Sequence, residues 1–491
     1  MLPAFLFCQW LATAAASEIF SAGPLHDRFE MTLDPGVQRT EIAGPLFYRT
    51  EAEHQHQWAL PPLLSRTVNL KIDSTEFDFL YPILTYDRYG TEYRLQLLQW
   101  LSFSGGETLD QEETDRFTLF PFYFQQRSDN PDRNYTALFP LYGTLKNRLL
   151  RDEIEFVLWP LYAKTVRGRS MIPGQAPGPR EYTTYNYLYP VFHVRRGENL
   201  RGWQVWPLAG HETRTAITHT NHWGDPETLP GHRKLFILWP FYFNQRADLG
   251  TDDPKHLHAL LPFYSRLRSP QRDSTTIPWP LGLTITQDRE KKYTEVGAPW
   301  PLIVFTRGEG KHTSRVWPFF SRSGHDTLQS DWYFWPVYKY NRIQSDPLDR
   351  ERTRILFFLY SDLIERNTAT GTALHRRDLW PLFTYREDHQ GKERLQILSL
   401  LEPLLPGNRG IERNWSPLWS LWRSERNPQT SATSQSLLWN LYRRETSPDL
   451  KKCSLLFGLF QYQSGSDGRR WRVFYLPFGR SENEPDASRS P

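Results

Sequence analysis

The sequence has few of the features that identify a disulfide-stabilised domain or a helical membrane protein. It contains only two cysteines and three methionines in 491 residues. Cys8 lies in the first 16 residues, so cleavage after that segment would leave Cys453 alone, with no intramolecular disulfide. The core must therefore come from side-chain packing. No apolar run approaches the roughly 20 residues that a transmembrane helix needs.

An excess of one charge is also missing. The chain has 59 basic and 55 acidic residues, for a net charge of +4. This near balance lacks the basic signature of nucleic-acid binding, so no nucleic-acid partner is expected. Arginine outnumbers lysine by 47 to 12, and 15% of the residues are aromatic. Because guanidinium groups stack well on aromatic rings, this bias suits an aromatic-rich surface.

Motifs for nucleophilic catalysis or nucleotide binding are absent. The sequence has no GxSxG elbow, no GxxxxGK[ST] loop and no GxGxxG turn after a strand. Carboxylates are abundant, but they lie in turns or alternate along strands, and no pair is marked as a glycosidase pair. We therefore assign no catalytic residue and no cofactor, and the sequence favours a protein that is not an enzyme.

Four histidines are the candidate metal ligands. His211, His219, His222 and His232 fall in one polar segment that also contains carboxylates. Imidazole and carboxylate groups suit zinc or copper. No HExxH or cysteine-based spacing accompanies them, and a solvated polar loop is the simpler explanation.

The N-terminal segment, residues 1–16 (MLPAFLFCQWLATAAA), has the pattern of a secretory signal peptide. An apolar run precedes Ala14, Ala15 and Ala16, which fit a small-residue cleavage site. The usual basic region is missing, because the first basic residue is Arg28, and cleavage after Ala22 or a short buried helix are the alternatives. The segment predicts export to the periplasm, the outer membrane or the cell surface.

What the sequence does contain is a repeat. The dipeptide Trp-Pro occurs eight times, where chance predicts about one or two, and Leu, Phe or Val always follows. The eight pairs are Trp159–Pro160, Trp206–Pro207, Trp239–Pro240, Trp279–Pro280, Trp300–Pro301, Trp317–Pro318, Trp335–Pro336 and Trp380–Pro381. Variants such as LFPFY (119–123) and LYPVF (188–192) bring the number of copies to about 22, at intervals of about 20 residues.

The segments between these motifs predict β-hairpins. They are polar, contain Gly, Asn and Asp, and are flanked by alternating apolar and polar residues. No window has a convincing helical period. We therefore predict an all-β fold of about 22 antiparallel hairpin units that form a closed or spiralling meander, a barrel or cocoon. A β-solenoid of hairpins is the alternative.

Proline cannot donate a hydrogen bond to a sheet, so its recurrence in apolar stretches constrains the fold. In EFVLWPLYAKT (155–165), Pro160 interrupts what otherwise reads as a buried strand. We predict that Pro160 lies at a kink, bulge or strand junction where no ladder donor is needed. The apolar residues around it predict that these junctions form a buried belt with Trp159 inside, and that the charged turns form the rims.

The domain organisation follows from the limits of the repeat. After the predicted signal peptide, residues 17–40 form an N-terminal extension with one possible strand, residues 41–479 the β-repeat domain, and residues 480–491 a disordered tail. Two long loops, 163–187 and 209–235, are expected on the same rim, one hairpin apart. Loops on a rigid scaffold commonly carry binding sites.

Three functions remain open on the sequence. The first is an exported, non-enzymatic scaffold or binding protein of the cell envelope. Its partner is left open, with a glycan or another envelope protein at the two long loops as the candidates. The second is an outer-membrane β-barrel, a pore or transporter, and membrane insertion is expected only in that form. Prolines within the ladder, apolar residues on both faces and a polar C-terminus oppose it. The third is a glycan-binding or glycan-active protein.

Overall fold

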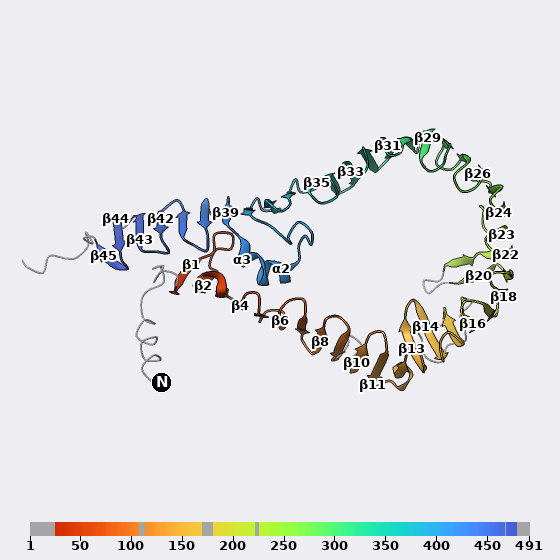
Figure 1. Ribbon diagram of the computed structural model, residues 1–491, viewed down its shortest axis with the longest axis horizontal. Helices are drawn as coiled ribbons and strands as arrows, with labels where there is room; N and C mark the ends of the chain where they lie inside the picture. The colour runs from red at the N-terminus through yellow and green to blue at the C-terminus, as the bar shows by residue number, and fades with distance from the viewer. Residues whose placement is uncertain (1–24, 108–112, 169–179, 221–224, 467, 479–491) are drawn as a thin grey trace, which may run out of the picture. The chain divides into compact units, whose positions relative to one another are not determined.

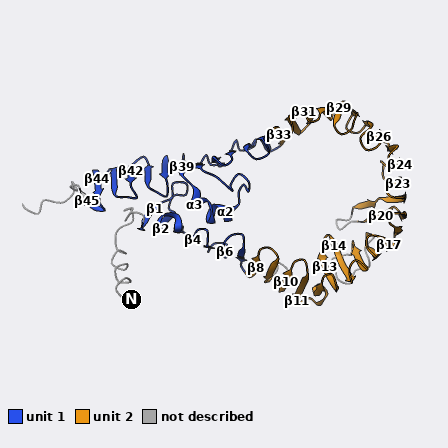
Figure 2. Ribbon diagram, viewed as in Figure 1, with its two compact units in different colours: residues 1–90, 346–491 blue, residues 91–345 orange. Residues whose placement is uncertain are grey.

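The computed structural model describes residues 25–107, 113–168, 180–220, 225–466 and 468–478. The predicted signal peptide (1–16) and the predicted tail (480–491) lie outside these residues. The chain divides into two compact units (Figure 2). Unit 1 comprises residues 1–90 and 346–491, and unit 2 comprises residues 91–345.

The elements follow one another along the chain as Figure 1 labels them. The N-terminal part of unit 1 contains β1 (Asp27–Glu30), β2 (Gln38–Ile42), η2 (Gly44–Leu46), β3 (Phe47–Glu51), β4 (Gln55–Leu60), β5 (Leu64–Asn69), β6 (Ser74–Phe79) and β7 (Leu84–Tyr89). Its C-terminal part contains β34 (Leu348–Ile355), β35 (Tyr360–Asn367), β36 (Ala373–Leu379), β37 (Phe383–Glu387), β38 (Glu393–Ile397), α2 (Arg409–Asn414), α3 (Ser416–Trp419), β39 (Trp422–Asn427), β40 (Ala432–Leu437), β41 (Tyr442–Thr446), β42 (Leu450–Leu455), β43 (Phe460–Gly465), β44 (Gly468–Val473) and β45 (Leu476–Phe478).

Unit 2 contains the remaining elements. They are β8 (Glu92–Leu97), β9 (Leu101–Gly105), β10 (Thr114–Leu119), β11 (Tyr123–Ser128), η3 (Pro131–Arg133), β12 (Tyr135–Leu138), β13 (Tyr142–Arg148), β14 (Arg151–Val157), β15 (Tyr162–Arg167), β16 (Tyr182–Tyr187), β17 (Phe192–Gly197), β18 (Leu200–Val205), β19 (Ala209–Arg214), β20 (Ile217–Thr220), β21 (Pro226–Leu229), β22 (Gly231–Ile237), β23 (Tyr242–Leu249), β24 (Lys255–Leu260), β25 (Tyr264–Arg268), β26 (Arg272–Ile277), β27 (Leu283–Asp288), β28 (Tyr293–Gly297), β29 (Ile303–Gly308), β30 (His312–Val316), β31 (Phe320–His325), β32 (Leu328–Tyr333) and β33 (Tyr338–Ser345).

The fold is an antiparallel β-meander, which confirms the predicted hairpin repeat. Within each unit, a strand pairs with the strand before it and the strand after it, as β14 pairs with β13 and β15. The hairpin of β20 and β21 is an excursion between β19 and β22, which pair with each other. Among the described residues of unit 1, β1 pairs only with β2 and β45 only with β44, so these strands do not close the sheet into a barrel.

The two edges of the unit 2 sheet differ in chemistry. Successive strands are antiparallel, so alternate turns lie on opposite edges. The turns that contain the Trp-Pro motif and its variants all lie on one edge, and the polar turns lie on the other. The repeat of about 20 residues is therefore one strand, one polar turn, a second strand and one apolar turn.

One row of side chains on one face of the sheet is buried or half-buried along its length. The row lies one residue inside the apolar turns, and in β14, β15 and β16 it consists of Phe156, Ala163 and Asn186, which are 4%, 7% and 8% exposed. Large and small side chains alternate across strands. A Cβ atom on Gly210, for example, would lie 2.3 Å from the ring of its cross-strand partner Phe236. A large side chain thus covers its small cross-strand neighbour, and the small residues of the row are buried without a second sheet packed over them.

Pro160 lies in the turn between β14 and β15, as predicted for a strand junction, and no bulge is present there. The Trp159–Pro160 peptide bond is cis. The Trp159 N–H donates to the Pro140 carbonyl (2.7 Å), and the Tyr189 N–H donates to the Pro160 carbonyl (2.7 Å). At this junction the residue before the proline is the donor and the proline carbonyl is the acceptor, so the missing proline N–H costs no ladder bond.

The predicted burial of Trp159 is wrong. Its side chain is 40% exposed, and the neighbouring Leu158 and Leu161 are 52% and 53% exposed. The junctions form an edge of the sheet instead of a buried belt, because the turns extend beyond the ends of the strands, where no layer of the described residues covers them. The prediction failed because apolar neighbours in the sequence indicate burial only when another layer packs on them.

The segment between β38 and β39 is a short helical insertion in a fold that is otherwise β, as predicted. It contains the short helices α2 and α3. Asn408 caps α2, since its side chain accepts a hydrogen bond from the Ile411 N–H (3.1 Å), and Pro417 stands in the first turn of α3. These helices are too short to produce a helical period in the sequence.

Candidate functional site

The first candidate is the edge of unit 2 that carries the apolar turns, here called the apolar edge. It consists of residues 98–100, 120–122, 139–141, 158–161, 188–191, 206–208, 238–241, 261–263, 278–282, 298–302, 317–319 and 334–337. Its exposed members include Trp100 (67%), Phe122 (56%), Leu161 (53%), Phe241 (52%), Phe263 (65%), Leu281 (57%), Phe319 (56%) and Phe334 (65%). Contiguous exposed apolar surface on this scale marks an interaction site.

Aromatic rings contact one another from turn to turn along this edge, in tilted orientations. The ring centroids of Phe139 and Trp159 are 5.3 Å apart, and those of Trp159 and Tyr189 are 6.2 Å apart. All three residues directly precede a proline. Trp206 and Trp239, which also precede prolines, are 5.9 Å apart. The Trp-Pro motif therefore joins neighbouring turns in two ways, through backbone hydrogen bonds and through contacts between aromatic rings. Each such contact contributes about 1 kcal/mol to stability.

The predicted motif residues all lie in apolar turns. Trp279, Trp317 and Trp335 are exposed, as are Trp159 and Trp239, whereas Trp206, Trp300 and Trp380 are partly buried. Trp380 and Pro381 belong to unit 1, where the indole N–H of Trp380 donates to the Leu400 carbonyl (3.0 Å). The predicted buried environment is therefore wrong for the five exposed tryptophans, whereas the other three are partly buried.

The four candidate metal ligands do not form one cluster within the described residues. His222 lies outside them. His211 on β19 and His232 on β22 are on opposite faces of the sheet, because His232 is paired with Arg214 and not with a residue of the His211 face. His219 on β20 lies 3.5 Å from Glu227. No group of three His, Cys, Asp or Glu side chains that could hold a metal exists in the described part of the chain.

Glu212 explains the environment of His232. Its carboxylate contacts the His232 Nε2 (2.7 Å) and accepts a hydrogen bond from Arg195. Burial opposes ionisation of Glu212, but the hydrogen bonds and positive charges of His232 and Arg195 outweigh it and lower its pKa to about 2. This is an ion-pair network on the sheet, and no metal is needed to account for it.

The two long loops are shorter than predicted. Strands β15 and β16 occupy both ends of 163–187, and residues 169–179 lie outside the described part. Strands β19 to β22 occupy most of 209–235, because motif spacing alone does not separate long loops from extra strands. Described residues of the two segments meet on the polar edge, where Arg180 donates to Glu227.

The second candidate is a cavity of about 710 Å³ in unit 1. Strands β2–β6, strands β36–β40 and the helical segment 398–421 contribute its walls. Seven arginines line it: Arg39, Arg376, Arg386, Arg394, Arg409, Arg413 and Arg423. Five carboxylates line it: Asp34, Glu41, Glu76, Glu402 and Glu412. The wall therefore carries a net charge of +2, and the volume suits a small-molecule ligand.

Three of these arginines form a row on one face of the sheet. Arg376 on β36 is directly opposite Arg386 on β37, which is directly opposite Arg394 on β38. Cross-strand partners have Cβ atoms about 5 Å apart, and like charges in this position are destabilising. Arg376 is neutralised by Asp378 (2.8 Å).

The guanidinium group of Arg394 has two carboxylate neighbours. Its Nε lies 3.2 Å from the Glu425 carboxylate, and its Nη1 lies 3.9 Å from Glu412. Burial and the positive charge of Arg423 lower the pKa of Arg394, and Arg386 adds to this effect. Burial opposes ionisation of Glu425, but Arg423 and Arg394 outweigh it and hold the Glu425 pKa at about 2.

The helical segment is fixed to both walls by buried polar contacts. Arg413 on α2 donates to Glu76 (2.7 Å) and Thr67 (2.8 Å) and pairs with the buried Asp78. Burial opposes charge on Arg413, but Asp78 and Glu76 outweigh it and raise its pKa. Glu402 accepts hydrogen bonds from Gln396 (2.8 Å), Ser399 (3.0 Å), Ser416 (2.5 Å) and Trp419 (3.1 Å). The Arg413 contacts connect segments more than 300 residues apart.

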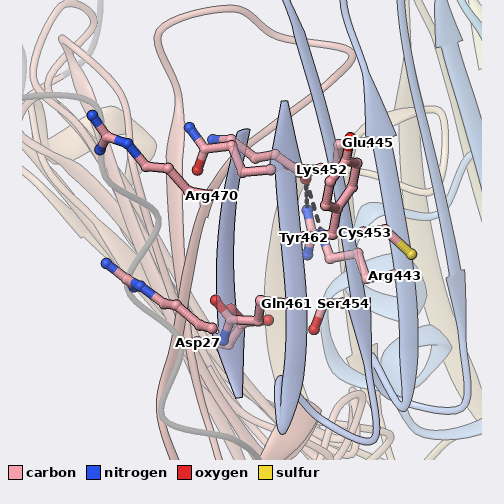
Figure 3. Close-up of a pocket in the computed structure, with 11 residues that line it drawn as sticks. Asp27, Arg443, Glu445, Lys452, Cys453, Ser454, Gln461, Tyr462 and Arg470 are labelled. Carbon is pink, nitrogen blue, oxygen red and sulfur yellow. Dashed lines mark hydrogen bonds and ion pairs between the residues drawn. The ribbon is translucent and has the colours of Figure 1, made fainter. Parts of the chain in front are cut away.

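A smaller pocket of about 70 Å³ lies on strands β41–β44, beside Asp27 of β1 (Figure 3). Arg443 and Glu445 form an ion pair in its wall, and the Arg443 guanidinium lies 3.1 Å from the centre of the Phe29 ring. Burial lowers the pKa of Lys452, which also lines this pocket. The pocket has room for only a few water molecules. We assign its residues a structural role, because they join β1 to the C-terminal strands.

Comparisons with known proteins give no family. No protein-family model matches the chain, and no curated protein sequence matches it. Among the described residues, no helix combines the length and the hydrophobicity needed to cross a membrane.

Sequence reasoning missed the arginine-lined cavity. Arg376, Arg386 and Arg394 stand on three different strands, and their adjacency depends on strand register, which the sequence does not state. The segments LHRRDL (374–379), LFTYRE (382–387) and KERLQI (392–397) each contain one of these arginines, but no local pattern marks the three as neighbours.

Proposed function

We propose that the protein is an exported, non-enzymatic β-repeat scaffold of the cell envelope that lies against a lipid surface along the apolar edge of unit 2. The observation that carries this proposal is the row of exposed apolar turns. Export itself rests on the signal-like N-terminal segment.

The order of side chains across the edge supports a lipid surface. Leucine and phenylalanine, such as Leu161 (53%) and Phe241 (52%), are more exposed than the tryptophans of the same turns. Trp159 and Trp239 stand beside them. Tryptophan prefers the boundary between lipid headgroups and acyl chains, where its ring is apolar and its N–H remains hydrated.

The geometry of the edge supports the same partner. Strands are about 4.8 Å apart, so successive apolar turns are about 10 Å apart and the row of turns is long and narrow. A globular partner would cover only a few turns, whereas an extended lipid surface can contact many. Each immersed Leu or Phe contributes about 1.5 kcal/mol, and linked weak contacts raise the overall affinity.

The first prediction concerns flotation with vesicles of phosphatidylethanolamine and phosphatidylglycerol. The wild-type protein is expected to float in both low and high salt, because salt screens charges but does not weaken apolar burial. Leu161→Asn combined with Phe241→Asn is expected to reduce the bound fraction at least about tenfold, which corresponds to about 1.4 kcal/mol.

Leu149 and Leu150 provide a matched control. They lie in the β13–β14 turn on the polar edge and are 80% and 91% exposed, more than any residue changed on the apolar edge. Leu149→Asn combined with Leu150→Asn removes more exposed apolar surface but should leave flotation unchanged. Equal loss in both double variants, or no flotation of the wild type, would reject the proposal. Retention on a glycan column without flotation would favour a glycan-binding protein.

A further inference from the structure

The cavity in unit 1 contains two arginines without a counter-charge. In the described part of the chain, Arg386 and Arg409 make no hydrogen bond and no ion pair. Both side chains line the cavity. The other five arginines of the cavity wall form ion pairs with carboxylates, so Arg386 and Arg409 are exceptions.

The carboxylates of the wall are already engaged and cannot neutralise them. Glu41 pairs with Arg39 (2.7 Å), Glu76 with Arg413 (2.7 Å), and Asp34 with Lys392 (3.4 Å). Glu402 accepts four side-chain hydrogen bonds, and Glu412 faces Arg394 at 3.9 Å. Arg386 and Arg409 therefore have no counter-charge in the described part of the chain, and both side chains are exposed to solvent, where a ligand can reach them.

The strand register places the positive charge of Arg386 where it does not stabilise the protein in the absence of a ligand. Arg386 stands directly opposite two other arginines, Arg376 and Arg394, and like charges in that position lower stability. A ligand with two or more negative oxygens would reverse this effect, because guanidinium groups bind planar or tetrahedral oxyanions through paired hydrogen bonds.

We propose that the unit 1 cavity binds the phosphate group of a ligand, with Arg386 and Arg409 as its primary contacts and Arg394 as a third. This inference is independent of the lipid surface proposed for unit 2. The cavity volume of about 710 Å³ leaves room for more than the phosphate group itself.

The second prediction concerns isothermal titration of the full chain with inorganic pyrophosphate. The wild type is expected to bind with Kd below about 1 mM. Arg386→Gln and Arg409→Gln should each weaken binding about tenfold or more, since hydrogen bonds between charged groups are among the strongest in proteins. Arg66→Gln is the matched control, because Arg66 is exposed on the face of β5 opposite to the cavity residue Thr67.

A melting experiment separates binding from structural damage. Without ligand, Arg386→Gln should melt at the same temperature as the wild type or higher, because it removes repulsion in the arginine row. With pyrophosphate, the wild type should gain more thermal stability than the variant. A variant that melts lower and binds pyrophosphate normally, or a wild type that shows no binding up to about 10 mM, would overturn the proposal.

Competition identifies the source of the phosphate group. Phosphatidylglycerol vesicles that displace pyrophosphate from the wild type, and not from the Arg386→Gln variant, assign the site to a lipid headgroup. Vesicles that leave pyrophosphate bound assign it to a soluble phosphorylated compound. Both results retain a phosphate site at Arg386 and Arg409.

Discussion

At the scale of single residues, the buried charges of unit 1 determine how its parts hold together. Arg413, Asp78 and Asn414 form a hydrogen-bonded group in which all three residues are buried, and Glu402 and Glu425 are buried beside the arginine-lined cavity. Burying a charge costs several kcal/mol unless a partner compensates for it. Each of these groups has such a partner, so unit 1 depends on its ionisation states.

Glu425 gives the third prediction, a loss of stability in acid. Its pKa is about 2 in the folded protein against an ordinary value of 4.5, so its contribution is complete above pH 4.5 and is lost as the pH falls toward 2. The difference corresponds to a free energy of unfolding on the order of 3 kcal/mol. Urea unfolding at pH 5 and pH 3, followed by tryptophan fluorescence, measures the part lost in this range, about 2 kcal/mol.

The Glu425→Gln variant is the control for this prediction. It should be less stable at pH 5, because Arg394 and Arg423 lose their counter-charge, and it should lose less stability than the wild type between pH 5 and pH 3. Glu212 in unit 2, whose pKa is also about 2, should retain part of the acid dependence. An equal pH dependence in both proteins would show that Glu425 does not contribute.

At the scale of elements, the apolar turn is the unit that the sequence repeats. Its first residue often has a positive φ, as in Leu158 (44°), Leu188 (50°) and Leu238 (47°). A leucine in this region costs about 1 kcal/mol, because its Cβ approaches the backbone. The repeat retains leucine there, although asparagine would be tolerated better. This choice is consistent with selection for an apolar surface at the edge.

Leu158→Asn is therefore the fourth prediction. Asparagine adopts positive φ more readily, and Leu158 is 52% exposed, so the free energy of unfolding should stay the same or rise by up to about 1 kcal/mol. Binding to lipid vesicles should fall. Leu161→Asn is the control, since Leu161 is 53% exposed in the same turn and is not at positive φ. It should weaken lipid binding without any gain in stability. A clear loss of stability in Leu158→Asn alone would contradict the strain argument.

At the scale of the whole molecule, unit 2 is a linear array in which strands contact their neighbours along the chain. In such arrays, stability is close to a sum of repeat and neighbour terms. Unit 1 is different, because β1–β6 contact the helical segment and strands β38–β41 through side chains. Unit 2 should therefore tolerate a change in its number of repeats. Unit 1 should not tolerate the loss of its side-chain contacts between distant segments.

Deletion of one repeat is the fifth prediction. Removing residues 261–277 deletes β25 and β26 and places Leu260 where Ile277 stands before the 278–282 turn. The shortened protein should fold with an unchanged β-type circular dichroism spectrum and melt within about 5 °C of the wild type.

The control deletion differs by a single residue. Removing residues 261–276 instead shifts β24 by one position relative to β27, which directs its side chains to the opposite face. This variant should melt lower or aggregate. If both deletions fail to fold, unit 2 is not an additive array.

The sequence by itself determined the repeat, its period, the all-antiparallel hairpin pattern and the position of each Trp-Pro motif. These follow from local chemistry, because alternation specifies strands, polar residues specify turns, and proline excludes a ladder donor. Strand register and the packing of distant segments were decided only by the tertiary structure. Whether Trp159 is buried depends on what lies over the turn, and Arg376, Arg386 and Arg394 become neighbours only through the register of three strands. The short helices and the cavity result from contacts between residues more than 300 positions apart, such as Arg413 and Asp78, which no local pattern encodes.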